Sequence, residues 1–387
     1  MTIQEKDSLY VASSYGRFPL TLVTGKGAKV YDDNGKEYID MGSGIAVNSM
    51  GIADDEWKEA VIAQLDALQH TSNLYYTGPC AELAEMLCTR TGMKKVFFSN
   101  SGAEANECAI KAARKYSYDK YGEGRHYIIT LKNSFHGRTV TTLAATGQDS
   151  FHTVFHPFTE GFVYASAQDF SEVEALAEQY PCAAIMMELV QGEGGVYALE
   201  KDYVQKVVAL AEKKDMLLII DEVQTGNGRT GSLYAYMDYG ITPDIVTTAK
   251  GLGGGLPIGA TMLGEKVKDT YTPGTHGSTF GGNPVCCAGA ISVLKRLDDK
   301  MLEDIRKKSE YIFSALSGAK GVKGLSGKGL MIGVETEKPA KEVILECMER
   351  GVLVLSAKTK VRLLPPYVIT YEELEKAVAV LKEVLAQ

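Results

Sequence analysis

Lys250 is the residue of this sequence whose setting most favours chemistry. It follows an apolar, β-prone run and precedes the glycine-rich stretch 251–255. Because its neighbours are apolar or glycine, we expect the amine to be partly buried, and burial lowers the pKa of a lysine and makes it nucleophilic. The glycines would let the chain pass close to a bulky ligand. The segment therefore indicates Schiff-base chemistry, and a solvated surface lysine is the alternative.

A carboxylate follows a second apolar run. Asp221 comes directly after Leu217–Ile220, a sequence typical of a buried strand. A buried carboxylate needs a cationic or hydrogen-bonding partner. That partner would be the protonated ring nitrogen of a pyridine cofactor, whose ring then acts as an electron sink. The alternative is a structural role, as a helix cap or in an ion pair with Arg229.

A third strand end carries small residues that suit an anion. Ser101, Gly102 and Ala103 close one predicted strand and open a predicted helix, whose N-terminus carries partial positive charge. This arrangement suits a phosphate. Ser101 with Glu104 also forms a capping-box pattern, so an ordinary helix cap is the alternative. Nucleotide binding has little support, because the chain contains neither a GxxxxGK[ST] nor a GxGxxG motif.

Two loops carry groups suited to binding. The stretch 276–284 is rich in glycine, and its Ser278 and Thr279 could donate hydrogen bonds to a phosphate or a carboxylate. Phe135 could cover a cofactor ring, and Arg138 could bind a carboxylate through two hydrogen bonds. A plain flexible loop, a core aromatic and a solvated arginine are the respective alternatives.

Arg362 lies in an apolar setting near the end of the chain. Buried arginines are seldom left unpaired. We therefore expect it to meet either Glu193 or a substrate carboxylate.

Composition limits the possible partners. The net charge is −8 and no long basic tract offsets it, which argues against nucleic-acid binding and against docking on anionic membranes. No apolar run has transmembrane length, and the polar N-terminus is unlike a signal peptide. Seven cysteines without a CxxC pair indicate reduced thiols. The cytoplasm is the expected location.

No metal site is expected. His152 and His156 could share one face of a helix and bind zinc, but the residues between them lack the glutamate of HExxH. A surface or interface pair of histidines is favoured instead.

The elements that must position these groups alternate along the chain. A β-meander is expected over 24–41, with a turn at Asp32–Gly35. Apolar runs then predict strands at 95–99, 127–130, 183–187, 217–220 and 244–248, and helices are expected at 103–116 and 203–214, with one long helix over 284–316. This alternation predicts an α/β fold with a mainly parallel sheet.

The polar clusters 99–103, 188–193, 221–224 and 250–255 each follow a predicted strand. In open α/β sheets ligands bind beyond the carboxyl ends of strands, so these clusters should surround one crevice. With 387 residues, two domains are expected. We expect a large domain over 51–283 and a smaller α+β domain over 284–387. The N-terminal segment 1–50 is expected to be part of the smaller domain.

In their order these segments resemble class III (subgroup II) pyridoxal-phosphate (PLP) aminotransferases of fold type I, over almost the whole chain. The matching motifs are SNSGAEANE (99–107), FHGR (135–138), ELVQGEGG (188–195), DEVQTG (221–226), TAKGLGGG (248–255) and HGSTFGGNP (276–284).

The resemblance implies specific roles. Lys250 would hold PLP as a Schiff base and then move the proton, while Asp221 pairs with the pyridine nitrogen. Phe135 would stack on the ring, and Gln224 would bind its 3-oxygen. The remaining cofactor-binding residues would be Ser101, Gly102, Ala103, His136, Glu188, Val223 and, from the partner subunit of a homodimer, Thr279.

Substrate residues follow from the same resemblance. Arg138, Ser278 and Tyr15 would hold the carboxylate of an ω-amino substrate. Arg362 would bind the α-carboxylate of glutamate and 2-oxoglutarate, and Glu193 would mask Arg362 while the ω-amino substrate reacts.

Within the family, the likeness is greatest to members that act on N-acetylornithine. Ornithine, succinylornithine and 4-aminobutyrate are alternative donors, and a catalytically silent PLP-fold binding protein is the alternative of another class. Two stretches depart from the usual pattern: Glu188-Leu189 stands where the family has Glu-Pro, and Gly51–Asp55 where it has Gly-His-x-His-Pro.

Overall fold

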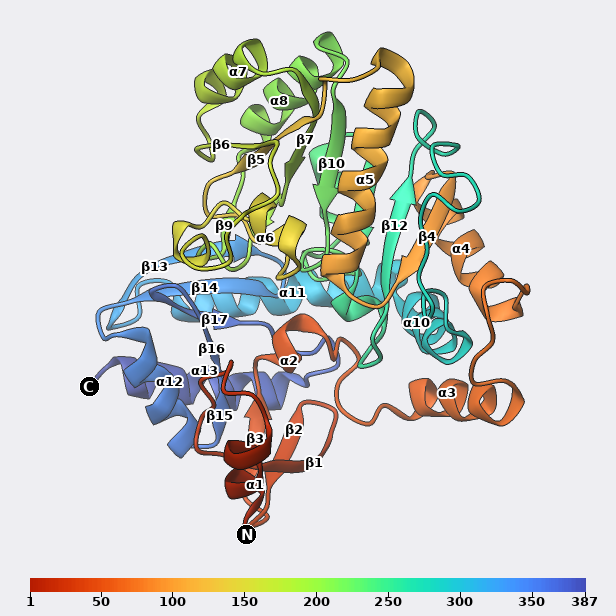
Figure 1. Ribbon diagram of the computed structural model, residues 1–387. Coiled ribbons are helices and arrows are strands. Elements are labelled where there is room, and N and C mark those ends of the chain that lie inside the picture. Colours follow the sequence, from red (N-terminus) through yellow and green to blue (C-terminus); the bar gives the residue numbers. More distant parts are fainter.

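A seven-stranded sheet forms the upper part of the molecule in Figure 1, in a computed structural model that describes residues 1–387. Its strand order is β4-β12-β11-β10-β7-β5-β6. In that order the strands are Lys95–Ser99, Gly259–Leu263, Ile245–Thr248, Leu217–Asp221, Cys182–Met187, Tyr127–Leu131 and Phe162–Ala165. Only β12 runs antiparallel to its neighbours. The predicted strands and the mainly parallel sheet are confirmed.

Helices cover both faces of this sheet. Successive strand residues point to opposite faces, so an apolar strand presents side chains to the helices on both sides. Leu217 and Ile219 of β10 pack in a cluster with α5 (Gly102–Tyr121), while Leu218 and Ile220 join the cluster that includes α7 and α8. Burial on both faces explains why these strands are uniformly apolar. The further helices of this part are α3 (Asp55–Ala67), α4 (Gly78–Thr91), α6 (Val140–Ala145), α7 (Phe170–Gln179), α8 (Lys201–Lys213) and α9 (Ala235–Tyr239).

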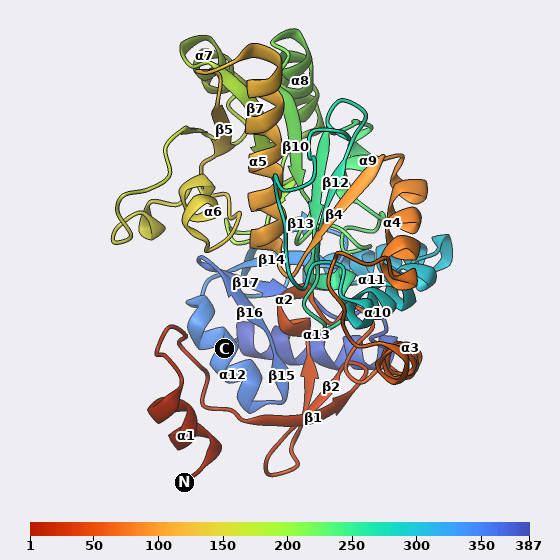
Figure 2. The same cartoon turned by 45° about the vertical axis from the view of Figure 1, so that its right-hand side comes forward.

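The lower part of the molecule combines both ends of the chain (Figures 1 and 2). The N-terminal strands β1 (Leu22–Lys26), β2 (Lys29–Asp32) and β3 (Glu37–Asp40) form the predicted meander, and β15 (Val352–Leu353) pairs with β3. The remaining strands are β13 (Val322–Lys328), β14 (Met331–Thr336), β16 (Leu355–Ala357), β17 (Lys360–Leu363) and the small pair β8 (Val190–Gln191) and β9 (Tyr197–Ala198). The helices are α1 (Ile3–Tyr10), α2 (Ser43–Ala46), α12 (Ala340–Glu349) and α13 (Tyr371–Leu385).

The predicted single helix over 284–316 is wrong. The chain instead forms α10 (Pro284–Arg296) and α11 (Asp299–Leu316). Asp298 separates them: its backbone is extended and its carboxylate accepts a hydrogen bond from the Met301 N–H at 2.8 Å. An aspartate that caps a new helix competes with continuation of the preceding one.

His152 and His156 do not share the face of a helix, which was the condition for a zinc site at these two residues. His152 ends the 3₁₀ turn Asp149–Phe151, and its Nε2 lies 2.9 Å from the Leu143 carbonyl. His156 follows in irregular chain before Pro157. The seven cysteines are free, and none of the helices is long and apolar enough to span a bilayer.

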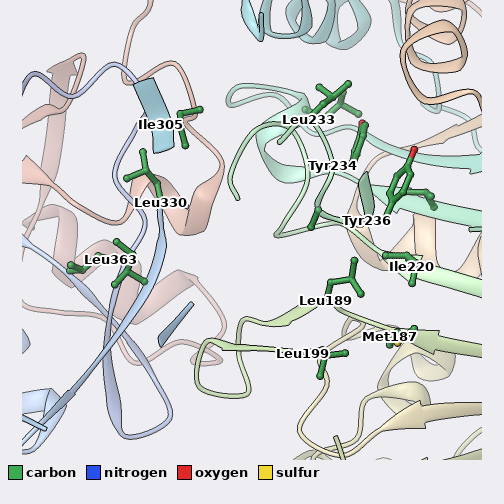
Figure 3. Packing of buried hydrophobic residues seen from close by; sticks show 14 of the residues in the cluster. Met187, Leu189, Leu199, Ile220, Leu233, Tyr234, Tyr236, Ile305, Leu330 and Leu363 are labelled. Carbon is green, nitrogen blue, oxygen red and sulfur yellow. The ribbon is translucent and has the colours of Figure 1, made fainter. Parts of the chain in front are cut away.

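One core cluster of 66 buried residues runs through both parts of the molecule. Figure 3 shows members from each: Ile305, Leu330 and Leu363 come from the lower part, and Leu233 and Tyr234 from the turn that follows β10. Because close packing resists sliding, this shared core fixes β17 relative to the carboxyl end of β10.

The turn after β10 is anchored by a buried carboxylate. Glu222 accepts hydrogen bonds from the Thr225 hydroxyl at 2.5 Å and from the Tyr236 N–H at 2.8 Å. Burial, with a further contribution from the neighbouring Asp221, raises the pKa of Glu222 to about 7. Folding therefore stabilises the protonated carboxyl of Glu222 relative to its ionised form.

The break between α10 and α11 is open to test. Asp298→Ala removes the cap of α11 and should lower the free energy of unfolding by about 1 kcal/mol. Thermal or urea denaturation measures the loss. Glu310→Ala, at an exposed position inside the same helix, is the control and should change stability by less than about 0.5 kcal/mol. If Asp298→Ala and Glu310→Ala lowered the free energy of unfolding equally, Asp298 would not stabilise α11 as a cap.

Glu222→Gln should change how stability depends on pH. A carboxyl whose pKa rises from 4.5 to about 7 on folding stabilises the fold fully below pH 4.5, and that contribution is lost as pH rises through 7. Relative to the glutamine variant, the protein should therefore lose on the order of 3 kcal/mol between pH 4.5 and 8. Urea denaturation at both pH values measures it. The exposed Glu85→Gln should show no such difference, and a pH-independent gap for Glu222→Gln would contradict the assignment.

Candidate functional site

The four polar clusters surround one cavity of about 420 Å³ beyond the carboxyl ends of β4, β7, β10 and β11. Its position confirms the crevice predicted from the strand ends. The lining residues are Val47, Asn100, Ser101, Gly102, Ala103, Asn106, Phe135, His136, Gly137, Arg138, Glu188, Val190, Asp221, Val223, Gln224, Thr225, Ala249, Lys250, Gly255, Leu256, Pro257 and Ile258.

Lys250 reaches this cavity from the end of β11. Its backbone is left-handed, with φ of 45°, and it begins the 3₁₀ turn Lys250–Leu252. No hydrogen bond or ion pair within the chain engages its amine. Burial lowers the pKa of Lys250, and the positive charge of Arg362 lowers it further, against the opposing carboxylates nearby. The amine is therefore deprotonated more easily than an exposed lysine, as a nucleophile must be.

Asp221 lies at the end of β10 and receives three hydrogen bonds. Its Oδ2 accepts from the Asn106 amide at 2.8 Å and lies 2.8 Å from Nδ1 of His136, while Oδ1 accepts from the Val223 N–H at 3.0 Å. Arg229 is not its partner, because that guanidinium donates to two carbonyls, those of Leu330 and Pro365. Asp221 is thus buried, faces a cavity and has no lysine or arginine bonded to it.

The N-terminus of α5 forms a tight cradle. Ser101 caps the helix by accepting the Glu104 N–H at 3.2 Å, as the sequence predicted. Gly102 has no room for a side chain, since a Cβ there would lie 2.5 Å from Val223 Cγ1. The backbone N–H groups that follow the cap belong to a helix of 20 residues that opens on the cavity. The same turn that carries the cap therefore presents backbone donors suited to an anion.

Glu188 fixes the aromatic side of the cavity. Its carboxyl oxygens accept hydrogen bonds from the N–H of Phe135 at 2.9 Å and of Gly192 at 3.4 Å. Burial, together with the charge of Asp221, raises the pKa of Glu188 well above its usual range. The shift acts toward the neutral carboxyl, and Glu188 holds the backbone of Phe135 in place through its hydrogen bond.

An ion pair lies at the edge of the cavity. Arg362, on β17, donates to Glu193 at 2.6 Å and to Gln224 Oε1 at 3.2 Å. Burial opposes the charge of Glu193, but the charge and hydrogen bond of Arg362 outweigh it and leave the pKa of Glu193 below its usual value. The expected pairing of the buried arginine with Glu193 is confirmed. Gln224 links this pair to the cavity wall.

Arg138 remains exposed at the mouth of the cavity. Its guanidinium lies over the ring of Phe151 at 4.0 Å and is 5.6 Å from the ring of Phe135. It has no carboxylate partner within the chain, so its donors remain available to a ligand.

Glu193 and Arg362 lie at the edge of the cavity and are not among its lining residues, and three further residues expected at the site do not line it either. Ser278 lies just behind it and accepts a hydrogen bond from the Asn100 amide at 3.3 Å. Thr279 is exposed in a separate hollow beside His70. Tyr15 is 74% exposed, on the N-terminal segment. A single chain therefore does not bring these groups to Lys250.

Sequence reasoning missed three polar residues that line the cavity, Asn100, Asn106 and Thr225, and of these Asn106 contacts Asp221 directly. Asn106 is buried on α5, donates to Asp221 and accepts the Thr247 hydroxyl at 2.7 Å. Its position four residues after Gly102 places it on the same helix face as the cradle, and that spacing was the available signal.

The two departures from the family pattern have structural roles. Leu189 is fully buried and belongs to the main core cluster. In the other stretch, Asp54 caps α3 by accepting the Trp57 N–H at 2.9 Å.

Comparisons with known proteins match aminotransferases over nearly the full length of the chain. The family model for aminotransferase class-III matches residues 10–385. An acetylornithine aminotransferase from Haemophilus ducreyi is 53% identical over the whole chain and 98% of that protein.

Solved structures agree. An ornithine aminotransferase from Toxoplasma gondii, described with partial occupancy of PLP at its active site, has a TM-score of 0.94 at 32% identity, covering 99% of this chain and 93% of that one. An N-acetylornithine aminotransferase from Stenotrophomonas maltophilia has a TM-score of 0.85 at 33% identity, covering 98% of each chain. The α/β fold, the cavity and the full-length matches together show that the chain belongs to the class III aminotransferase family.

Proposed function

We propose that this protein transfers the δ-amino group of N2-acetyl-L-ornithine to 2-oxoglutarate, a reaction that would serve arginine biosynthesis. The products would be N-acetyl-L-glutamate 5-semialdehyde and L-glutamate. The observation that carries the proposal is the single cavity in which a buried lysine, a buried carboxylate and a helix N-terminus face one another. The names of relatives that are 41–53% identical over nearly the whole chain favour this substrate.

The residues of the cavity fit PLP. The amine of Lys250 has no bonded partner within the chain and could react with the aldehyde of PLP. The Gly102–Ala103 turn offers backbone donors for the phosphate. Asp221, to which no lysine or arginine is bonded, offers a counter-charge for a protonated ring nitrogen. Phe135 lines the same space and supplies an aromatic face.

When bound, PLP supplies an aldehyde that condenses with amines and a ring that takes up the electrons left behind when a substrate carbon loses its proton. Asp221 stabilises the protonated ring nitrogen, and its three hydrogen bonds keep the carboxylate oriented. The Lys250 amine would serve as the general base and acid that moves a proton between the substrate carbon and the bound cofactor. The lowered pKa of Lys250 suits this exchange.

Two arginines would sort the two substrates. Arg138, with its free donors at the mouth, would hold the carboxylate of the ω-amino substrate, assisted by Ser278 and Tyr15. Arg362 would hold the α-carboxylate of 2-oxoglutarate and glutamate. The 2.6 Å pair with Glu193 would mask Arg362 while the ω-amino substrate reacts.

Ornithine is the second candidate donor, because the Toxoplasma gondii neighbour is named an ornithine aminotransferase. Succinylornithine and 4-aminobutyrate remain further alternatives within the class. A silent binding protein is disfavoured, since Lys250, Asp221 and Arg362 are all present and in reach of one cavity.

We further propose a homodimer in the cytoplasm whose sites are shared. Thr279 would contact the phosphate in the partner's site, because it lies outside the cavity of its own chain. Large apolar side chains are exposed near it, among them Tyr75, Tyr76 and Phe280, at 70%, 106% and 58%. Such a cluster indicates a surface that another chain covers.

The domain division 1–50, 51–283 and 284–387 also stands as a proposal. The pairing of β15 with β3 supports it, since this contact attaches the N-terminal strands to the C-terminal quarter of the chain.

The substrate is decided by steady-state rates. Of N-acetylornithine, ornithine, succinylornithine and 4-aminobutyrate, N-acetylornithine should give the highest kcat/KM with 2-oxoglutarate. Lys250→Ala should abolish the visible absorbance of the bound cofactor and lower kcat at least about 10³-fold. Lys213→Ala, an exposed lysine on α8, is the control and should leave both unchanged. A higher kcat/KM for another donor would reassign the substrate.

Shared sites are tested with hybrid dimers. Thr279→Asp should repel the phosphate of the partner's site, so this variant and Lys250→Ala should each have little activity alone. When the two are unfolded together and refolded, half of the dimers should be hybrids with one intact site, restoring about a quarter of the activity. The control mixes Lys250→Ala with Asp221→Ala, which alter the same site and should give no recovery. Absence of recovery in the first mixture, with dimers formed, would contradict a shared site.

A further inference from the structure

Asn227 is a buried side chain that the mechanism above does not use. It lies in the turn that follows Asp221 and Gln224, is 1% exposed, and has a left-handed backbone with φ of 57°. Asparagine tolerates that conformation better than most residues. A buried amide must find partners for two donors and an acceptor oxygen, so its contacts show what it holds together.

The donors of Asn227 are directed at the segment that carries Lys250. Its Nδ2 donates to the Thr248 hydroxyl at 2.8 Å and to the Ala249 carbonyl at 3.3 Å. Ala249 directly precedes Lys250. The amide thus binds both residues through which β11 leads into the lysine.

The other polar atoms of Asn227 join two further segments. Its Oδ1 accepts the Tyr234 hydroxyl at 3.3 Å, and its backbone carbonyl accepts the Tyr367 hydroxyl at 2.8 Å. Tyr367 follows closely after Arg362 along the chain. One residue therefore links the turn after Asp221, the approach to Lys250 and the segment that follows the arginine.

The backbone at Lys250 needs such support. Lys250 has φ of 45°, in the left-handed region that disfavours residues with a side chain. A non-glycine residue with positive φ persists only when its surroundings hold it. The Ala249 carbonyl also accepts the Leu252 N–H at 2.9 Å, so Asn227 is the link from this turn to the chain that bears Asp221.

We propose that Asn227 is a positioning residue, whose amide sets the place of the Lys250 amine relative to Asp221. The inference rests on the proposed function, in which these two groups act on opposite parts of one cofactor. Without the amide, the turn at Ala249 loses its tie to the loop after β10, and the amine samples positions away from the reacting carbon. Misplacement of about 1 Å is enough to cost a large factor in rate.

The test is Asn227→Gly in the enzyme loaded with PLP. Glycine accepts positive φ and retains the backbone carbonyl bonded to Tyr367, so only the amide is lost. We expect kcat to fall about tenfold, with the KM values of both substrates changed less than about twofold. The pH midpoint of the visible absorbance, which reports the proton shared by Lys250 and the cofactor, should shift by about half a unit or more.

Tyr234→Phe is the matched control, because it removes a hydrogen bond to the same side chain while leaving in place the donations of the amide to Thr248 and Ala249. It should cost comparable thermal stability and leave kcat and the absorbance midpoint unchanged. The proposal is overturned if Asn227→Gly keeps its midpoint and loses only folded protein, or if Tyr234→Phe shifts the midpoint equally.

A second variant serves if Asn227→Gly does not fold. Thr248→Val removes the hydroxyl that accepts the 2.8 Å hydrogen bond from Asn227, at nearly constant side-chain volume. It should shift the pH midpoint of the absorbance by less than Asn227→Gly does, and an unchanged midpoint would contradict the proposal. Failure of the proposed function would show differently, as an unaltered protein that forms no visible band and transfers no amino group.

Discussion

The desolvation of charge at the carboxyl ends of the central strands is the constraint on which the site depends. Asp221 and Glu188 are buried there and Lys250 and Glu193 partly buried, and each must be neutralised or paired. The structure uses a different means for each. Asp221 is held by three hydrogen bonds, Glu193 by the charge of Arg362, and burial favours the neutral forms of Glu188 and Lys250.

This division of charge is also what allows chemistry. If Glu188 carried a full charge beside Asp221, the two carboxylates would oppose each other, and the amine of Lys250 would be held protonated by both. With Glu188 favouring its neutral form, one buried carboxylate remains for a cationic ring. The hydrogen bond from Phe135 to Glu188 makes the same residue a structural anchor for the aromatic wall.

The sequence was sufficient for what depends on local pattern. Uniformly apolar runs, such as Leu217–Ile220, predicted burial on both faces, and the polar residues that follow them predicted one crevice. The pairing of Arg362 with Glu193 followed from the rule that a buried guanidinium needs a partner. The break at Asp298 was missed because two amphipathic helices in succession show nearly the same periodicity as one, and a single capping residue decides between them.

Contacts between distant segments could not be predicted in this way. The hydrogen bond from Asn106 to Asp221 joins residues 115 positions apart, and the Gly102–Val223 contact joins two strand ends that only the sheet order brings together. Arg229 was considered as a partner for Asp221 on proximity in sequence. It turns instead to carbonyls of the lower part, at Leu330 and Pro365.

Backbone strain gathers around the same cavity. Ser43, Ile45 and Ala46 have φ of 49°, 63° and 62°, and this left-handed turn packs against the turn of Lys250, which is itself left-handed. Each such residue costs about 1–3 kcal/mol, and a β-branched isoleucine is especially unfavourable there. The core that runs through both parts of the molecule can bear this cost. Positive φ at the lysine itself and in the turn packed against it therefore indicates that the whole fold, rather than the local sequence, imposes the position of Lys250.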